Sequence, residues 1–85
     1  MDALPTQFVY EYTPDVQIVL HSDACPHGSG WRAQAVDNTS SNTASGCWVH
    51  GKNNTVVLFL EDDNHKGVYF DFTFVKDFFK PIYGQ

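Results

Sequence analysis

The chain has 85 residues, a formal net charge of -5 and an aromatic content of 15%, which indicates one domain over residues 1–85 with one core. Its five basic residues are scattered, so the basic stripe of a nucleic-acid-binding surface is missing and we expect no direct contact with nucleic acid. No apolar stretch approaches the roughly 20 residues of a membrane span, and the N-terminus lacks the pattern of a signal peptide. These features predict a cytoplasmic protein without a membrane segment.

The first half of the chain predicts three strands. Residues 1–7 read as a loose lead-in that contains a proline. Apolar and polar side chains then alternate in the way that is typical of half-buried strands, over residues 8–13, 16–21 and 31–36. The segment 37–45 is polar, with no large apolar side chain to bury, so we expect a mobile loop there.

The second half predicts up to three more strands. Residues 46–50 form a short one, and the unbroken apolar run in 55–61 indicates a central strand covered on both faces. Residues 68–75 alternate cleanly. We therefore expect the most buried side chains to include Val57, Leu58, Phe59, Phe70 and Phe72.

After residue 75 the apolar spacing changes to that of a short helical turn, which Pro81 stops, or of an apolar tail that closes the end of a barrel. The predicted fold is all-β: a small antiparallel meander of five or six strands, curled into a barrel or half-barrel.

Two cysteines and two histidines carry the chemistry of a candidate zinc site. Cys25, His27, Cys47 and His50 would supply two thiolates and two imidazoles, an acceptable tetrahedral zinc set. A Cys25–Cys47 disulfide is the alternative and needs an oxidising compartment, and two reduced cysteines are the third interpretation. For a cytoplasmic protein we expect neither a metal nor a disulfide.

No catalytic arrangement stands out. A cysteine lies near a histidine at residues 25 and 27, but no third residue that would orient the pair is identifiable. We therefore predict that the protein is not an enzyme and needs no cofactor.

Several aromatic side chains are left over once each strand has placed one face inward. A single sheet has two faces, and this sequence offers no long helix to cover the second. A second copy is the simplest cover, so we expect a homo-oligomer, with a dimer favoured. The rival is a tail that folds back into its own barrel, and Trp48 could instead be covered by the 37–45 loop. The candidate interface residues are Tyr10, Tyr12, Trp48, Phe78, Phe79 and Tyr83.

A pattern over residues 25–78 resembles small proteins encoded by bacteriophages and prophages. Its elements are Cys25-Pro, Gly30, the alanines at 33 and 35, the tripeptide at 46–48, an apolar strand ending in Glu-Asp, and Gly-Val-Tyr at 67–69. The resemblance implies a phage or prophage origin more than an activity. We predict a non-catalytic accessory protein in the host cytoplasm that acts by protein–protein contact, with a host or virion protein as a further partner. The alternatives are an acidic inhibitor occupying a basic site of a host nucleic-acid enzyme and a small zinc-stabilised module.

Overall fold

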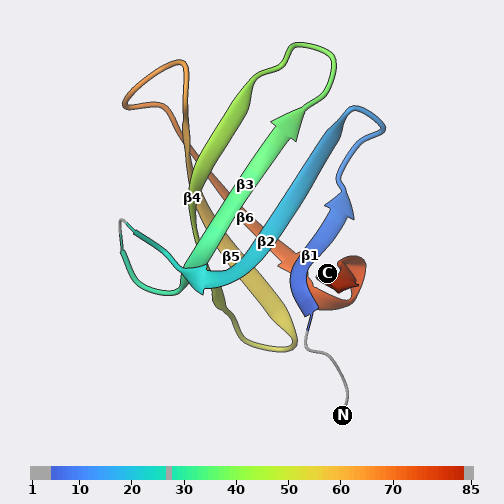
Figure 1. The fold of residues 1–85 in the computed structure, drawn as a ribbon. Helices are drawn as coiled ribbons and strands as arrows, with labels where there is room; N and C mark the ends of the chain where they lie inside the picture. The colour runs from blue at the N-terminus through green and yellow to red at the C-terminus, as the bar shows by residue number, and fades with distance from the viewer. Residues whose placement is uncertain (1–4, 27, 84–85) are drawn as a thin grey trace.

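The structure of this chain is a computed structural model that describes residues 5–26 and 28–83 (Figure 1). Over those residues the chain is all-β, as its sequence predicts. Its elements in chain order are β1 (Pro5–Glu11), β2 (Val16–Ala24), β3 (Trp31–Asp37), β4 (Thr43–His50), β5 (Thr55–Asp62), β6 (Tyr69–Val75), the 3-10 turn η1 (Lys76–Phe78) and β7 (Lys80–Tyr83).

All the strands belong to one antiparallel sheet. From β1 to β6 each strand pairs with the next one along the chain. β7 leaves this meander and pairs with β1, which gives the order β6-β5-β4-β3-β2-β1-β7. Within the described part of the chain, no ladder joins β6 to β7, so the sheet is open. The prediction of a closed barrel is therefore wrong.

The sheet curls until β1 and β6 face each other. Tyr10 in β1 packs against Phe74 in β6, with ring centroids 5.4 Å apart, and Tyr12 packs against Phe72 at 5.7 Å. Because four strands separate β1 from β6 in the sheet order, these contacts require strong curvature. Figure 1 shows β6 passing behind β2 and β3. The sheet thus has a concave inner face and a convex outer face.

The structure has seven strands rather than five or six, because the C-terminal end adds β7. The helical turn after β6 is confirmed as η1, but the residues beyond it form β7 instead of an apolar tail. Pro81 is tolerated there because β7 is an edge strand. Part of the predicted lead-in belongs to β1, which begins at Pro5; residues 1–4 lie outside the described residues.

The polar segment 37–45 is a shorter loop than predicted. β3 extends to Asp37 and β4 begins at Thr43, where it pairs with Val36. The backbone N–H groups of Asp37 and Ser41 close the intervening turn by donating to the carbonyls of Asn42 and Asp37, both at 2.9 Å. The prediction failed because a ladder between strands needs only backbone groups, which small polar residues provide as well as large apolar ones.

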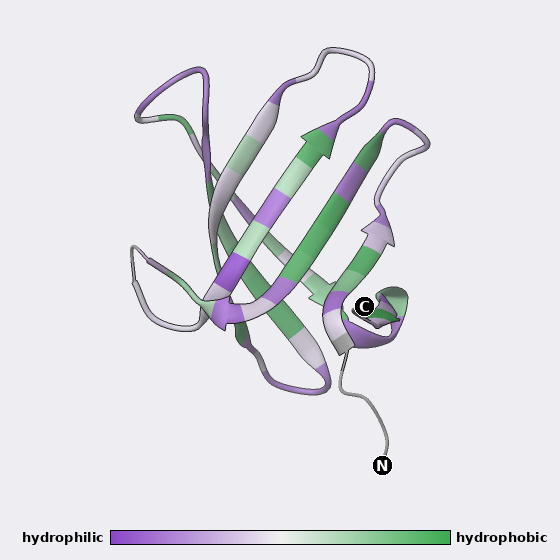
Figure 2. Ribbon diagram, viewed as in Figure 1, coloured by the Kyte–Doolittle hydropathy of each residue, from purple (hydrophilic) through white to green (hydrophobic). Residues whose placement is uncertain are grey.

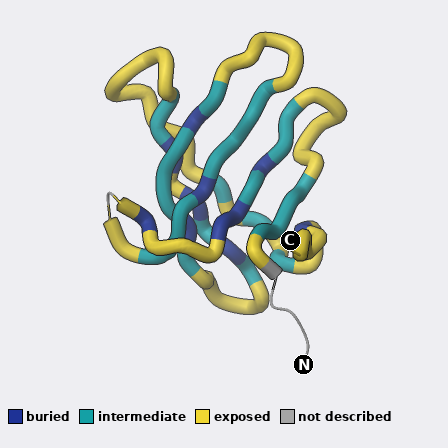
Figure 3. Tube along the Cα trace, viewed as in Figure 1, coloured by how far each residue is buried: buried dark blue, intermediate teal, exposed yellow. Residues whose placement is uncertain are grey.

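The core lies on the concave face. Figures 2 and 3 show apolar residues and buried segments recurring along β2, β4 and β5. In β5 the alternation is sharp: Val56, Leu58 and Leu60 are at most 1% exposed, whereas Phe59 between them is 54% exposed. The buried core comprises Ile18, Leu20, Ala33, Ala44, Trp48, Val56, Leu58, Leu60 and Phe79.

The predicted core is therefore only partly correct. Leu58 is fully buried, and Phe72 is half-buried against the core. The outer face of β5 has no second layer over it within the described residues, so Phe59 is exposed and Val57 is half-buried. Phe70 is on the inner face but is 40% exposed. The assignment of 55–61 as a central strand covered on both faces is wrong, because the outward Phe59 is exposed and β5 is second from the edge.

Candidate functional site

Small side chains form the floor of the concave face. In the ladder between β3 and β4, Ala33 pairs with Gly46 and Ala35 pairs with Ala44. Gly46 cannot be larger, because a Cβ there would lie 1.8 Å from the Phe59 carbonyl oxygen. Small residues on a concave floor leave volume above them, which large neighbours must fill or which stays open as a pocket.

That volume stays open at one end of the sheet. An apolar pocket of about 300 Å³ lies over Ala35 and Ala44, walled by the apolar side chains of β2 and β5 and by aromatic rings from β6 and from the segment just after β1. The rings are those of Tyr12, Phe70 and Phe72. This position explains why Phe70 is 40% exposed although it points inward: it forms a wall of the pocket rather than a part of the filled core.

The pocket opens at the end of the sheet where the loops 12–15, 38–42 and 63–68 meet, uppermost in Figure 1. These loops are hydrogen-bonded to one another. Asn38 donates from its backbone N–H to the Asp15 carbonyl at 2.8 Å, and the Asn64 amide donates to the Asn42 side-chain oxygen at 2.7 Å. A further bond at 3.0 Å runs from the Asp63 N–H to the carbonyl of Thr43. The mouth of the pocket is therefore tied together rather than formed by independent loops.

This end of the molecule is strongly acidic. Lys66 is the one Lys or Arg within residues 11–16, 37–43 and 61–69, and His65 lies 3.4 Å from the Asp62 carboxylate. Two acidic residues, Asp37 and Asp62, line the pocket itself. The acidic residues in these ranges are Glu11, Asp15, Asp37, Glu61, Asp62 and Asp63.

Hydrogen bonds hold one of the pocket carboxylates in its charged form. The Thr39 hydroxyl donates to Asp37 Oδ1 at 2.7 Å, and the Thr39 backbone N–H donates to the same atom at 2.9 Å. These bonds favour the carboxylate and lower the pKa of Asp37 below its usual value of 3.8. Asp37 is therefore a fixed negative charge at neutral pH.

A second feature is the free edge of β6. The Asp62 N–H donates to the Val68 carbonyl and the Lys76 N–H to the Asn54 carbonyl, so in the β5–β6 ladder the even-numbered residues of β6 bond to β5. The N–H and C=O groups of the odd-numbered residues 69–75 then point away from β5, where no described strand pairs with them. Beside this edge the outward side chains of Phe59, Tyr69 and Val75 are 40–68% exposed.

The six candidate interface residues fall into two groups. Tyr12, Phe78 and Tyr83 are about half exposed. Trp48 and Phe79, at 5% and 6%, belong to the core, and Tyr10 is half-buried against it. Phe79 is buried because the C-terminal segment of η1 and β7 folds back onto the sheet. This is the alternative that the sequence left open to self-association through the same segment.

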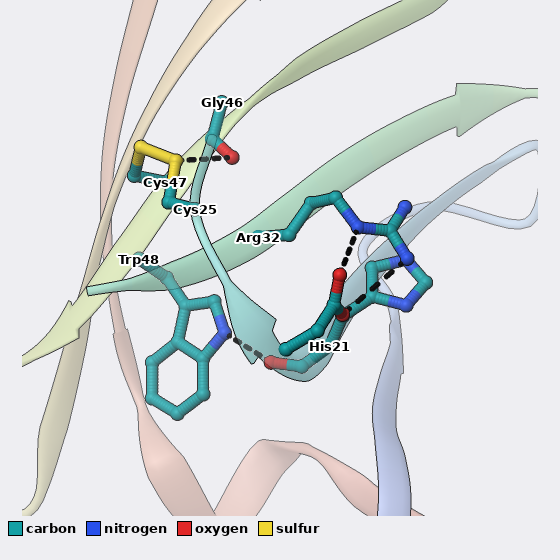
Figure 4. The surroundings of a disulfide bond; sticks show 7 residues. His21, Cys25, Arg32, Gly46, Cys47 and Trp48 are labelled. Carbon is teal, nitrogen blue, oxygen red and sulfur yellow. Dashed lines mark hydrogen bonds and ion pairs between the residues drawn. A yellow bond between two sulfur atoms is a disulfide. The ribbon is translucent and has the colours of Figure 1, made fainter. Parts of the chain in front are cut away.

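Trp48 is buried by the sheet and not by the 37–45 loop. Its ring lies 4.8 Å from that of Trp31, and its Nε1–H donates to the His21 carbonyl at 2.9 Å (Figure 4). The inner face of a curled sheet is the covered one, which is why the face opposite Cys47 is buried rather than solvated.

The two cysteines form a disulfide, so the prediction of reduced cysteines is wrong. Cys25 and Cys47 are bonded, with Cα atoms 5.5 Å apart (Figure 4). The bond joins the end of β2 to β4 on the outer face of the sheet, because Cys47 pairs with the outward Phe59. Spacing along the chain could not reveal this, since a separation of 22 residues says nothing of distance in space.

The candidate zinc set is not assembled either. Bonded cysteines supply no thiolates, so they cannot act as metal ligands. His50 is on the opposite face from Cys47, with its ring against Trp31 and Trp48, and His27 lies outside the described residues. Within the described residues no cluster of three or more His, Cys, Asp and Glu side chains could hold a metal ion. The Cys25–Cys47 bond therefore removes two of the four ligands on which the alternative of a zinc-stabilised module depends.

Polar groups beside the disulfide are already paired. Arg32 donates from Nε to Asp23 Oδ2 at 2.9 Å, and His21 Nε2 lies 3.1 Å from the Gln34 side-chain oxygen (Figure 4 shows the ion pair). Hydrogen bonding to Arg32 lowers the pKa of the exposed Asp23. Both contacts join β2 to β3, two interior strands of the sheet.

No helix among the described residues has the length and apolar character needed to cross a membrane. No family model matches the chain, and no curated protein or solved structure matches it either. The candidate sites therefore stand on the geometry of the chain itself.

The sequence alone did not reveal the pocket or the free edge of β6. Two signals were present: small side chains at alternate positions of 31–36, and acidic residues in or beside three loops that a meander brings to one end. Neither signal shows whether the volume above the small residues is filled, because that depends on how far the sheet curls.

Proposed function

We propose that this chain is a non-catalytic protein that acts through protein–protein contact, and that it pairs with a second copy along β6. The observation that supports this proposal is the free edge of β6, with exposed apolar side chains beside it. Unpaired strand edges are ready templates for pairing with another strand.

The two edges of the sheet differ in how well they are protected. β7 carries Lys80 and Pro81, and both residue types block strand addition. β6, with the sequence Tyr-Phe-Asp-Phe-Thr-Phe-Val, has neither Lys nor Pro and contains one charge, Asp71. An edge left open in this way favours β6 over β7 as the contact strand.

The sequence of β6 fits an antiparallel copy of itself. With Phe72 on the two-fold axis, Asp71 lies opposite Thr73 of the second copy, and Tyr69 lies opposite Val75. These are odd-numbered residues, whose backbone groups point to the free edge, so the pairing satisfies them. A register centred on Asp71 would oppose two like charges, which is unfavourable. A two-fold dimer is also the commonest symmetric assembly.

Thr73 offers a test that changes no buried contact, because its side chain is exposed. Thr73→Asp places a carboxylate opposite Asp71 of the second copy, whereas Thr73→Lys places an ammonium there. Light scattering over a dilution series should give a dimer for the native chain and for Thr73→Lys, and a shift toward monomer for Thr73→Asp.

A monomeric mass for the native chain at high micromolar concentration would refute the pairing. Equal dimerisation of the two Thr73 variants would refute this register. Because both substitutions change one exposed side chain, circular dichroism should show the same fold for both.

The disulfide bears on where such a contact is made. Disulfides persist in oxidising compartments and are rare in the cytoplasm, so the Cys25–Cys47 bond favours an oxidising compartment over the cytoplasmic location that the sequence predicts. A phage or prophage accessory role, with a host or virion protein as a further partner, stays a prediction from the resemblance.

A further inference from the structure

We propose that the pocket at the loop end of the sheet binds a small organic cation, with an apolar body the size of one or two rings and a protonated amine. The body would lie over Ala35 and Ala44 between the aromatic walls, and the amine would sit at the mouth beside Asp37 and Asp62. This site is distinct from the β6 contact and does not depend on it.

The shape of the pocket favours a small molecule. Its volume of about 300 Å³ is at the lower end of the range for ligand pockets, which runs from roughly 300 to 1,000 Å³. It is hollowed into the concave face, with Ile18 and Leu60, each at most 1% exposed, in its walls. Apolar walls with a few polar groups at one side are typical of sites that bury the body of a ligand and orient it by its polar end.

The negative charge at the mouth of the pocket favours a ligand whose polar end is positively charged. Two acidic residues belong to the pocket lining, and the neighbouring loops and strand ends add further acidic residues with Lys66 as their one Lys or Arg. The field at the mouth is therefore negative, which attracts cations and repels anions. Tyr12, Phe70 and Phe72 add aromatic faces, which also attract cations.

The site is preorganised. Hydrogen bonds between the loops tie Asp15 to Asn38 and Asn42 to Asn64, and the Thr39 turn fixes the Asp37 carboxylate. A ligand therefore does not have to order the mouth as it binds, and the conformational cost of binding falls.

Three probes with the same ring system and different charges provide the test: tryptamine, indole and indole-3-acetate. Binding is followed by the NMR shifts of the Ala35 and Ala44 methyl groups in the native protein. Tryptamine, protonated at pH 7 like a lysine, should bind roughly twofold to fivefold more tightly than indole, as expected for exposed ion pairs. Indole-3-acetate should bind most weakly, and added salt should reduce the difference between tryptamine and indole.

Three variants locate the site. Ala35→Leu fills the pocket with a side chain that the cavity can accommodate, and it should weaken tryptamine binding at least tenfold. Asp37→Asn keeps the oxygen that accepts from Thr39 and removes the charge, so it should reduce the preference for tryptamine and leave indole unchanged. Asp77→Asn, in η1 at the opposite end, also removes one negative charge and should change neither the affinity for tryptamine nor that for indole.

Four outcomes would contradict the proposal. Equal binding of the three probes would refute the selection for cations, and tryptamine binding that survives Ala35→Leu would refute the location. No saturable shift at millimolar tryptamine would refute the site. If a Lys-Trp-Lys peptide bound and tryptamine did not, the mouth would be a contact for a basic protein and not a small-molecule site.

Discussion

The two ends of the curled sheet are built in opposite ways. At the end with the β2–β3 and β4–β5 turns, the concave face is filled by Trp31 and Trp48, with His50 packed against both rings. The Cys25–Cys47 disulfide ties the outer face there. At the loop end, small residues leave a pocket of about 300 Å³, bordered by carboxylates.

The filled end therefore provides the stability of the fold, and the loop end provides the candidate binding pocket. A chain of 85 residues buries only about 60–65% of its unfolded surface and has little stability in reserve. Filling one end with indole rings and a covalent bond concentrates the stabilising contacts there, which lets the other end keep an unfilled volume. We therefore expect substitutions at the filled end to lower the free energy of unfolding most.

The largest effect is expected at Trp48. It is 5% exposed, packs against Trp31 with the ring planes tilted by 33°, and donates a buried hydrogen bond to the His21 carbonyl. Trp48→Ala should lower the free energy of unfolding by about 3–5 kcal/mol, measured by denaturant titration. Trp48→Phe keeps a ring but leaves that carbonyl unpaired, so it should cost less. A loss below about 1 kcal/mol for Trp48→Ala would contradict the view that this end carries the stability.

The disulfide should have the next largest effect. Replacing both Cys25 and Cys47 with alanine removes a cross-link between residues 22 apart, which should cost about 3 kcal/mol on the chain-entropy account. The double variant avoids leaving one reactive thiol. The denatured native protein should show no titratable thiol until reductant is added. A full thiol titre before reduction, or equal stability of the two proteins, would remove the disulfide from this comparison.

The sequence predicted the features that depend on residues close together in the chain, and it did not predict those that depend on residues far apart in it. Alternation along 68–75 and the Gly- and Asn-rich turns identified strands, because those signals depend on neighbouring residues. The Cys25–Cys47 bond, the pairing of β7 with β1 and the burial of Trp48 depend on residues brought together by the curl of the sheet. Phe59 shows the same limit, since an apolar run cannot reveal whether a second layer covers its outer face.

A smaller effect is expected at the loop end. Phe70 forms a pocket wall and is 40% exposed, so Phe70→Ala removes less buried contact than its inward position suggested and should cost about 1–2 kcal/mol. Leu58→Ala, at a fully buried position of the neighbouring strand, should cost about 2–5 kcal/mol. Denaturant titration of the two variants compares the ends directly. A larger loss for Phe70→Ala would mean that the pocket end is as tightly packed as the rest.

The smallest effect concerns the charge at the mouth of the pocket. The Thr39 hydroxyl and backbone N–H both donate to Asp37, so the pKa of Asp37 in the folded protein lies below its usual value of 3.8. A lowered folded pKa contributes stability that is present above the unfolded value and is lost as the pH falls through the folded value. The carboxyl carbon of Asp37, followed by NMR against pH, should therefore titrate below 3.8. Thr39→Val removes the hydroxyl but keeps the backbone donor, so it should move the midpoint up, toward the usual value, without reaching it. An unchanged midpoint would mean that the hydroxyl does not hold the charge, and the negative field at the mouth would then depend on the other carboxylates of the three loops.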